Sequence, residues 1–252
     1  MRGQLDLTFP EDTHLVALSG GADSSAMALA LAEREPRDYT YICTPTGDEL
    51  PEMVAHMERL ERLLGKPILR IINGTLDGWI EEFAAVPNWR MRWCTRLLKI
   101  QPFMAWIRQQ PGRVVTYVGL RADEPLREGL LVQDDKDGTG PTILQRYPLR
   151  RWGWNRKGVS GFLKCHGVEI PRRTDCARCY GQQLGEWHNL WEQHPDIYEG
   201  AAAQERAYGH TFRSAQRDTW PAGLDELAAE FMRGRKIRQQ NREFDGCRVC
   251  RL

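Results

Sequence analysis

The stretch that decides the fold runs His14-Leu-Val-Ala-Leu-Ser-Gly-Gly-Ala-Asp-Ser-Ser-Ala-Met-Ala-Leu-Ala-Leu-Ala32. Its first apolar residues, Leu15–Leu18, predict a buried strand, and its alanine-rich half predicts a helix. Between them, Ser19-Gly-Gly predicts a turn, and Asp23-Ser-Ser offers side chains that can cap the helix. Glycines let backbone N–H groups approach an anion, and a helix amino terminus adds about half a positive charge. The stretch therefore predicts a phosphate-binding loop, made of Ser19, Gly20, Gly21, Asp23, Ser24 and Ser25.

Apolar runs and helical patterns alternate along the first part of the chain. The expected strands span 15–18, 40–44, 68–72 and 114–120, and the expected helices span 24–34, 49–64 and 96–109. Such alternation predicts an α/β fold with a mostly parallel, doubly wound sheet that helices cover on both faces. Ligands of these sheets bind beyond the carboxyl ends of the strands. The segments that follow the strands are therefore expected to meet in one crevice.

The character of the sequence changes near residue 150, where tryptophans, arginines and cysteines crowd together. Later helical patterns span 182–193, 197–208 and 224–239, and a polar loop is expected at 133–141. We therefore expect a nucleotide-binding α/β domain over 1–149 and a helical, cysteine-containing extension over 150–252 that packs on it.

Composition narrows the class of protein. The chain has 252 residues, of which 41% are hydrophobic, enough for one good core. It holds no run of 18 apolar residues and its first residues lack a signal-peptide core, so we expect no membrane span and a cytoplasmic location. There, its seven cysteines are expected to be metal ligands or redox groups. The charge is −5 over 1–145 and +6 over 146–252, so the second part is the better candidate to meet a polyanion.

Several stretches together resemble a known superfamily. Ser19-Gly-Gly-Ala-Asp-Ser24 is similar to the SGGxDS signature of PP-loop ATP pyrophosphatases, and it lacks the Gly-Lys-Ser/Thr of a Walker A loop. The stretches similar to its phosphoadenosine-phosphosulfate (PAPS) reductase-like branch are Thr46-Gly-Asp-Glu-Leu-Pro-Glu52, Trp93-Cys-Thr-Arg-Leu-Leu-Lys-Ile-Gln-Pro102, Gly119-Leu-Arg-Ala-Asp-Glu-Pro-Leu-Arg127 and Asp175-Cys-Ala-Arg-Cys179. The second of them most resembles the sulfurtransferase subunit of DNA phosphorothioation systems and phage-type PAPS reductase-like proteins. The resemblance covers roughly residues 14–200 and implies a Rossmann-like, adenine nucleotide alpha-hydrolase-like fold.

The resemblance implies an adenine nucleotide, ATP or PAPS, bound with Mg²⁺ at the predicted loop. Ser24 would add a hydroxyl to the backbone amides, and Asp23 would orient the loop or help to hold Mg²⁺. Besides the loop, the residues expected to bind the nucleotide are Thr46, Asp48, Lys99, Gly119 and Arg121. Asp48 would bond a ribose hydroxyl or organise its own loop, and the alternative is a helix N-cap.

Basic side chains are expected to offset the charge of the nucleotide. Arg121 and Arg127 are candidates to neutralise a leaving pyrophosphate or sulfonucleotide, and surface salt bridges are their alternative role. Lys99 lies one helical turn from Arg96, so both can face one anion, and a solvated helix face explains the pair equally well.

The cysteines admit three interpretations. Cys176-x-x-Cys179 and Cys247-x-x-Cys250 have metal-ligand spacing, which alone suggests a structural zinc site. The resemblance places Cys94 beside the nucleotide crevice and implies that it joins Cys176 and Cys179 on a 4Fe-4S iron–sulfur cluster. Cys165 is the nearest candidate for a fourth ligand, and Cys247 and Cys250 are the others. Zinc and unmetallated thiols are the alternatives.

Three functions follow from these features. The first is ATP-dependent adenylation of an acceptor with pyrophosphate release, followed by sulfur transfer to a nucleobase or nucleic acid, with a possible sulfur-donor protein. The second is PAPS or APS reduction by a C-terminal thiol, for which Arg248 and Arg251 would lower the pKa of Cys247. The third is a metal-stabilised nucleic-acid-binding or partner subunit without turnover. The basic, aromatic stretches that would contact nucleic acid are 146–157 and 233–242. The expected catalytic residues are Asp23, Ser24, Arg121 and Cys247.

Overall fold

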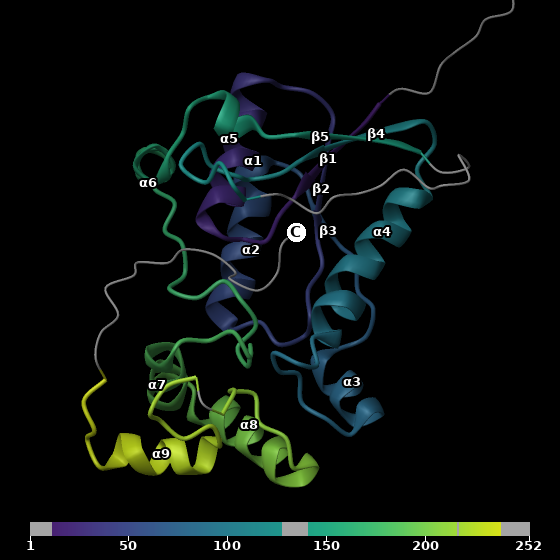
Figure 1. Cartoon of the computed structure of the whole chain (residues 1–252). Helices are drawn as coiled ribbons and strands as arrows, with labels where there is room; N and C mark the ends of the chain where they lie inside the picture. Colours follow the sequence, from purple (N-terminus) through teal and green to yellow (C-terminus); the bar gives the residue numbers. More distant parts are fainter. Residues whose placement is uncertain (1–11, 128–140, 216, 238–252) are drawn as a thin grey trace, which may run out of the picture.

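The computed structural model describes residues 12–127, 141–215 and 217–237. Within them, five parallel strands form one sheet in the order β3-β2-β1-β4-β5 (Figure 1). The strands are β1 (Thr13–Ala17), β2 (Tyr39–Cys43), β3 (Ile68–Arg70), β4 (Arg113–Tyr117) and β5 (Thr142–Arg146). The predicted parallel α/β fold is confirmed. The sequence analysis missed β5, an edge strand that is only partly buried and so carries a weaker apolar pattern.

The strand order places a topological switch point beside β1. From β1 the chain runs outward through β2 to β3, and it then returns to the other side of β1 with β4 and β5. The loops that leave β1 and β4 therefore diverge to opposite sides of the sheet. In open α/β sheets such a divergence leaves a crevice at the carboxyl ends of the strands, where ligands bind.

Helices cover both faces of this sheet, as predicted. The helices are α1 (Ala22–Arg34), α2 (Pro51–Leu64), α3 (Leu76–Phe83), the π-helix η1 (Thr95–Ile100), α4 (Gln101–Arg108), α5 (Pro148–Arg151), α6 (Arg156–Cys165), α7 (Leu184–Gln193), α8 (Pro195–Tyr208) and α9 (Leu224–Met232). Figure 1 shows α1 and α2 on one face of the sheet and α4 on the other, with α7, α8 and α9 grouped at one end of the molecule. No helix of the described ranges is long and apolar enough to cross a membrane.

The alternation of side chains along β1 builds two cores. Val16 is buried on the α1 face, whereas Leu15 is buried on the other face, where it packs with Phe103 and Ile107 of α4. Full burial of such an aliphatic or aromatic side chain contributes about 1.5–3 kcal/mol. The continuous apolar run Leu15–Leu18 in the sequence therefore reflects a strand that is buried on both faces of the sheet.

Several local expectations were wrong. Helix α1 begins at Ala22 with Gly21 at its N-cap position, so Asp23, Ser24 and Ser25 lie inside its first turn and do not cap it. The expected helix 96–109 opens as a π-helix, and α3 and α6 were missed because both are short. Helix α9 ends at Met232 instead of continuing to 239, the last two residues of that expectation lying outside the described ranges.

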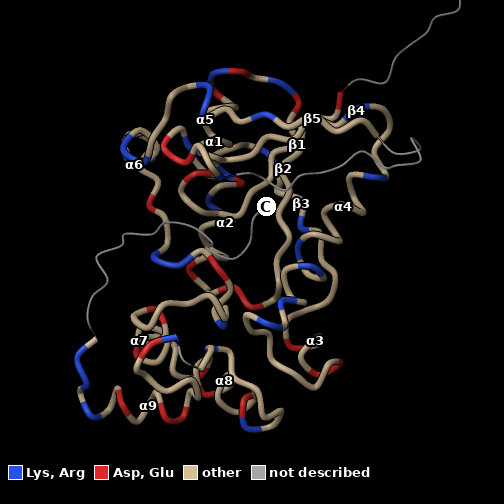
Figure 2. Tube along the Cα trace, viewed as in Figure 1, with Lys and Arg blue, Asp and Glu red and all other residues tan. Residues whose placement is uncertain are grey.

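The second half of the chain contributes to two different cores. Helices α5 and α6 pack on α1, and Val159 and Leu163 join its core. Helices α7, α8 and α9 form a separate core with α3 and η1, centred on the fully buried Trp187. Figure 2 shows Lys and Arg on α5 and α6, whereas the charged residues of α7 and α9 are all acidic and α8 carries both signs. The division into 1–149 and 150–252 stays a prediction.

Candidate active site

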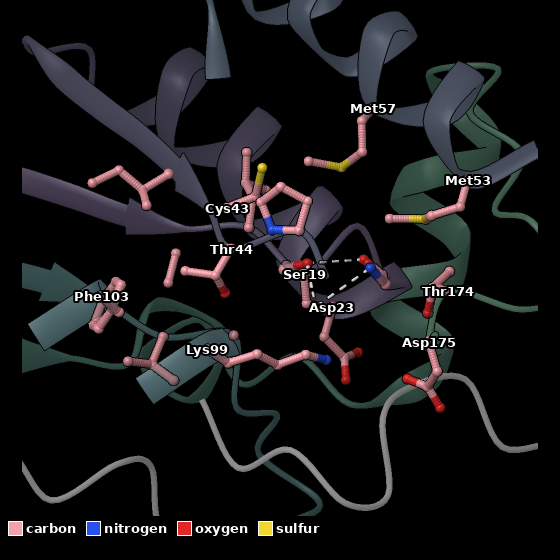
Figure 3. A pocket seen from close by; sticks show the side chains of 18 of the residues that line it. Ser19, Asp23, Cys43, Thr44, Met53, Met57, Lys99, Phe103, Thr174 and Asp175 are labelled. Carbon is pink, nitrogen blue, oxygen red and sulfur yellow. Dashed lines mark hydrogen bonds between the residues drawn. The ribbon is translucent and has the colours of Figure 1, made fainter. Parts of the chain in front are cut away.

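The predicted phosphate loop joins the carboxyl end of β1 to the first turn of α1. Ser24 Oγ donates to the Gly21 carbonyl at 3.1 Å and lies 3.1 Å from Ser19 Oγ. Both hydroxyls therefore stand together at the amino end of a 13-residue helix, where backbone N–H groups and the helix dipole favour an anion. Ser19, Gly21, Asp23 and Ser24 line a pocket at this point (Figure 3).

Two residues of the predicted loop, Gly20 and Ser25, are not among the described residues that line the pocket. Ser25 is fully buried and lies 3.4 Å from His56 Nε2, and burial lowers the pKa of His56 so that the ring stays neutral. Gly20 has a φ of +73°, and a Cβ built on it would lie 1.9 Å from Met53 Cε. Gly20 and Ser25 therefore support the conformation of the loop. The turn needs a left-handed residue without a side chain at position 20, and position 25 takes a small side chain that is buried.

Asp23 and Arg121 form an ion pair at the edge of the pocket. Arg121 Nη1 donates to Asp23 Oδ2 at 2.7 Å, and each side chain is 13% exposed. Burial raises the pKa of Asp23, while the Arg121 guanidinium opposes that rise. The two residues that were expected to act separately on phosphate and Mg²⁺ therefore hold one another, and Asp23 positions the guanidinium beside the phosphate loop.

The loop after β2 is organised around Glu49 and Asp48. Glu49 Oε1 accepts from the Thr46 N–H and hydroxyl at 2.7 and 2.8 Å. Asp48 is buried, and its carboxylate accepts from the Arg178 Nε at 2.5 Å and backbone N–H at 2.8 Å. The N-cap is corrected, because α2 takes Leu50 at its N-cap position. The ribose contact is corrected as well, because the Asp48 side chain is only 3% exposed and is not among the described residues that line the pocket. Asp48 organises its loop, which was the remaining alternative.

The π-helix η1 decides which of its own two basic residues lines the pocket, to which Arg127 also contributes. Among the described residues, the wall includes Lys99 but not Arg96, which is exposed. A π-helix carries more than four residues per turn, so residues three apart no longer share a face as they do in an α-helix. The expectation that Arg96 and Lys99 would face one anion together is therefore wrong, and Lys99 is the one that lies in the pocket.

Other walls of the pocket were not foreseen from the sequence. Met53 and Met57 of α2 and Cys43 of β2 supply an apolar side, and burial raises the pKa of the Cys43 thiol to about 11. Thr174 and Asp175 close the pocket from a segment far away in sequence (Figure 3). The available signal for these two was their position directly before Cys176 in the Asp-Cys-x-x-Cys stretch.

Comparison with known proteins identifies the family of the chain. The family model of the phosphoadenosine phosphosulfate reductase domain matches residues 13–172, which is more than half of the chain. The chain belongs to this family. The predicted PAPS reductase-like membership is thereby confirmed, and the finer likeness to the DNA phosphorothioation sulfurtransferases stays a prediction.

Two further comparisons found proteins that are similar to this chain. An uncharacterized protein of Methanocaldococcus jannaschii is 23% identical over 194 residues, which cover 73% of this chain and 40% of that protein. The chain thus spans about two fifths of the length of that relative. The crystal structure of phosphoadenylyl-sulfate (PAPS) reductase from Candida auris, a phosphate complex, is 14% identical and covers 65% of this chain and 76% of that chain, with a TM-score of 0.48.

The cysteines of this reductase-domain protein lie in different places. Cys176 lines the pocket, with its Sγ 3.3 Å from Thr46 Oγ1. Arg92 Nε donates to Tyr180 Oη at 2.8 Å, which ties the segment of Cys94 to the one that carries Cys179. Cys165, in contrast, is exposed at the end of α6, which packs on α1. The expected fourth ligand is corrected, because α6 belongs to another core than Cys94.

The described cysteines do not by themselves complete a metal centre. Within the described ranges, no three His, Cys, Asp or Glu side chains group as metal ligands. Cys247 and Cys250, the other candidates for a ligand, lie outside those ranges, as does the expected catalytic role of Cys247. An iron–sulfur or zinc site on Cys94, Cys176 and Cys179 stays a prediction, and no step of the chemistry is derived through it.

The basic, aromatic stretch 146–157 is engaged within the molecule. Arg150 Nη2 donates to the carbonyls of Glu124 and Arg127 at 2.6 and 2.5 Å, and thereby supports the loop that carries Arg121. Trp154 stacks under the Arg34 guanidinium at 4.7 Å. These contacts show that part of the stretch is used for packing within the molecule. Contact with nucleic acid stays a prediction for it and for 233–242, of which 238–242 lie outside the described residues.

Proposed function

We propose that this protein binds ATP in the pocket beside β1 and transfers its adenylyl group to an acceptor, with release of pyrophosphate. The observation that carries the proposal is that the Ser19–Ser24 loop and Lys99 face the same pocket, at the carboxyl end of the central strand. Backbone N–H groups at a helix amino terminus and a lysine across from them are suited to a chain of phosphates. Membership of the reductase-domain family supports an adenine nucleotide as the ligand.

The side chains then take separate roles. Ser24 and Ser19 would bond the phosphates nearest the loop, and Lys99 would offset charge on the opposite side. Arg121, held by Asp23, would stabilise the charge that develops on the leaving pyrophosphate. We further propose that sulfur supplied by a donor then attacks the adenylated acceptor and displaces AMP, so that a bond to sulfur replaces the bond to the adenylyl group. The Cys176 thiol in the wall of the same pocket supports this step. A nucleobase or nucleic acid as acceptor, and a sulfur-donor protein, belong to this proposal.

The test combines binding with turnover. We expect calorimetry to detect ATP binding, and ATP–pyrophosphate exchange to appear with the acceptor. Ser24→Ala should reduce both by about tenfold or more, because a hydrogen bond to a charged phosphate is lost. Ser160→Ala, on the exposed side of α6, is the matched control and should leave both unchanged. Equal exchange in Ser24→Ala and wild type would contradict the proposal.

The family favours a second candidate, reduction of a sulfonucleotide. In that reaction a cysteine thiolate attacks the sulfonate sulfur of PAPS and displaces the nucleotide, and a dithiol reductant then releases sulfite. Supplied PAPS and a dithiol should yield sulfite in wild type, and Cys247→Ser should abolish it. Sulfite release that survives both Cys247→Ser and Cys250→Ser would remove the C-terminal thiols from this mechanism.

A further inference from the structure

Three carboxylates among the described residues line the nucleotide pocket, and two of them are held by hydrogen bonds of 3.0 Å or less. Asp23 is paired with Arg121 at 2.7 Å. Glu49 accepts from Thr46 through Oε1, and its Oε2 accepts from the Gly47 N–H at 3.0 Å. Both carboxylates are therefore occupied in holding the walls of the pocket.

Asp175 is the third carboxylate, and its surroundings differ. Its Oδ2 lies 3.9 Å from Arg173 Nη2, while its Oδ1 is buried without a hydrogen-bond partner among the residues that the structure describes. The side chain is 16% exposed. A buried, charged oxygen without a partner costs free energy unless an ion or a water satisfies it. The position of Asp175 in a pocket makes a bound ligand the natural source of that partner.

The segment that carries Asp175 lies against the phosphate loop. A Cβ built on Gly21 would stand 3.6 Å from Thr174 Oγ1, so the two backbones come close. The segment is fixed, because Arg173 donates twice to the Cys176 carbonyl at 3.1 and 2.9 Å and Cys176 forms a β-bridge with Glu49. Figure 3 shows the Asp175 and Asp23 carboxylates and the Lys99 amine directed to the same side of the pocket.

We propose that Asp175 binds the Mg²⁺ ion that accompanies the triphosphate, with Thr174 beside it at the phosphate loop. Mg²⁺ in phosphate sites is held by one or two carboxylates together with phosphate oxygens, and it keeps several waters. One buried carboxylate oxygen next to the loop meets that need, whereas without the cation the same oxygen would repel the phosphates. Asp175 therefore selects a metal-bound triphosphate over a metal-free anion. This inference rests on the proposed binding of ATP.

The decisive experiment measures ATP affinity by calorimetry, once with Mg²⁺ and once with EDTA. In wild type, Mg²⁺ should tighten binding by about tenfold or more. In Asp175→Asn that ratio should fall close to one, while metal-free ATP binds as well as or better than in wild type, because the repulsion is gone. Glu186→Gln is the matched control: Glu186 lies 3.4 Å from Arg173 Nη1 but outside the pocket wall formed by the described residues, and its variant should keep the wild-type ratio.

A second readout follows the cation directly. Mn²⁺ added with ATP should give a bound electron-paramagnetic-resonance signal in wild type and a much weaker one in Asp175→Asn, with circular dichroism confirming that the variant folds. An unchanged Mg²⁺ ratio in Asp175→Asn, or an equal loss of affinity with and without Mg²⁺, would overturn the assignment. Wild type that fails to bind ATP under either condition would instead refute the proposed function itself.

Discussion

Gly119 lies where the chain leaves β4 and passes the first turn of α1. A Cβ on this residue would stand 3.1 Å from the Ser24 backbone nitrogen and 3.2 Å from the Asp23 carbonyl carbon. Both neighbours are backbone atoms of the phosphate loop, so they cannot move aside without shifting the loop. The single missing methyl group therefore sets the distance between two walls of the pocket.

Gly119→Ala should destabilise the fold by about 1–3 kcal/mol, because the extra methyl overpacks a backbone contact. It should also weaken ATP binding, since the amides of the loop are displaced. Urea unfolding and calorimetry measure the two effects. Gly161→Ala is the control, because no described atom lies within 4 Å of its Cβ and it lies in helix α6. That variant should be neutral or slightly stabilised, and an equally stable Gly119→Ala would contradict the contact.

Ala84 ends helix α3 in the left-handed region, with a φ of 47°. Alanine pays a steric cost there that glycine avoids. Ala84→Gly should therefore stabilise the protein by about 1 kcal/mol in urea unfolding. The reverse change at the equivalent end of α2, Gly65→Ala at a φ of 64°, should destabilise it by a similar amount. Opposite signs for the two variants are the expected result, and a destabilised Ala84→Gly would count against it.

At the scale of elements, the π-helix η1 brings a lysine into the pocket. The Asn73 side chain donates to the Leu97 carbonyl at 2.9 Å and so supports the widened turn. Widened turns of this kind occur often at functional sites, because they redirect one side chain. Here the redirected residue is Lys99.

Lys99→Ala should weaken ATP binding by about tenfold or more, through loss of a charged contact. Arg96→Ala should change it little, because among the described pocket walls Lys99 is present and Arg96 is not. Calorimetry on both variants at one ionic strength separates a specific contact from general charge. An equal loss of ATP affinity in the two variants would mean that binding depends on the net charge of the protein and not on a specific contact. That result would contradict the role given to η1.

At the scale of the whole molecule, Arg178 joins segments that are far apart in sequence. Beyond Asp48, its Nη1 donates to Asp77 of α3 at 2.7 Å and to Gln204 of α8 at 2.9 Å. The loop after β2 is thereby tied to the core of α7, α8 and α9. A buried guanidinium that bonds three elements makes the pocket depend on the helices at the far end of the molecule.

Arg178→Met should destabilise the protein by about 3–5 kcal/mol, because it leaves the Asp48 carboxylate buried without its partner. Arg206→Met is the matched control, since Arg206 also pairs with two carboxylates, on the exposed surface of α8. Exposed pairs contribute about 0–1 kcal/mol, so that variant should unfold close to wild type. Denaturant unfolding measures both. Equal unfolding midpoints for the two variants would show that burial of the Arg178 ion pair does not add to stability.

Glu205 makes the stability of the helical core depend on pH. Its carboxylate accepts from the Phe212 and Leu224 N–H groups at 2.8 and 2.7 Å, and burial raises its pKa from 4.5 to about 7. The folded state therefore binds this proton more tightly than the unfolded state. Stability contributed by the protonated form is present below pH 4.5 and is lost as pH rises toward 7.

The free energy of unfolding of wild type should fall relative to that of Glu205→Gln as pH rises from about 5 to 8. The expected change is on the order of 3 kcal/mol. Urea unfolding at several pH values measures it. The Glu199→Gln variant, on the exposed surface of the same helix, should track wild type throughout. A difference between wild type and Glu205→Gln that stays constant with pH would show that the carboxylate does not titrate in this range.

Local sequence patterns predicted much of the fold correctly. The alternation of apolar strands and helices predicted the parallel sheet, and the Ser19–Ser24 stretch predicted the loop at the carboxyl end of β1. The sequence missed β5 and the short helices α3 and α6, whose signals span too few residues to stand out. It left the role of Asp48 open, because the partner that decides this role, Arg178, lies 130 residues away in the sequence.

The sequence by itself determined the family, the order of the first sheet-forming segments and the position of the glycine loop between β1 and α1, because these depend on neighbours along the chain. Tertiary structure decided which side chains reach the pocket. The widening of η1 favoured Lys99 over Arg96, and the Arg178 pair turned Asp48 inward. The return of residues 174–176 to the phosphate loop brought Asp175 to the site. Such choices rest on hydrogen bonds and burial between distant segments, which no local pattern contains.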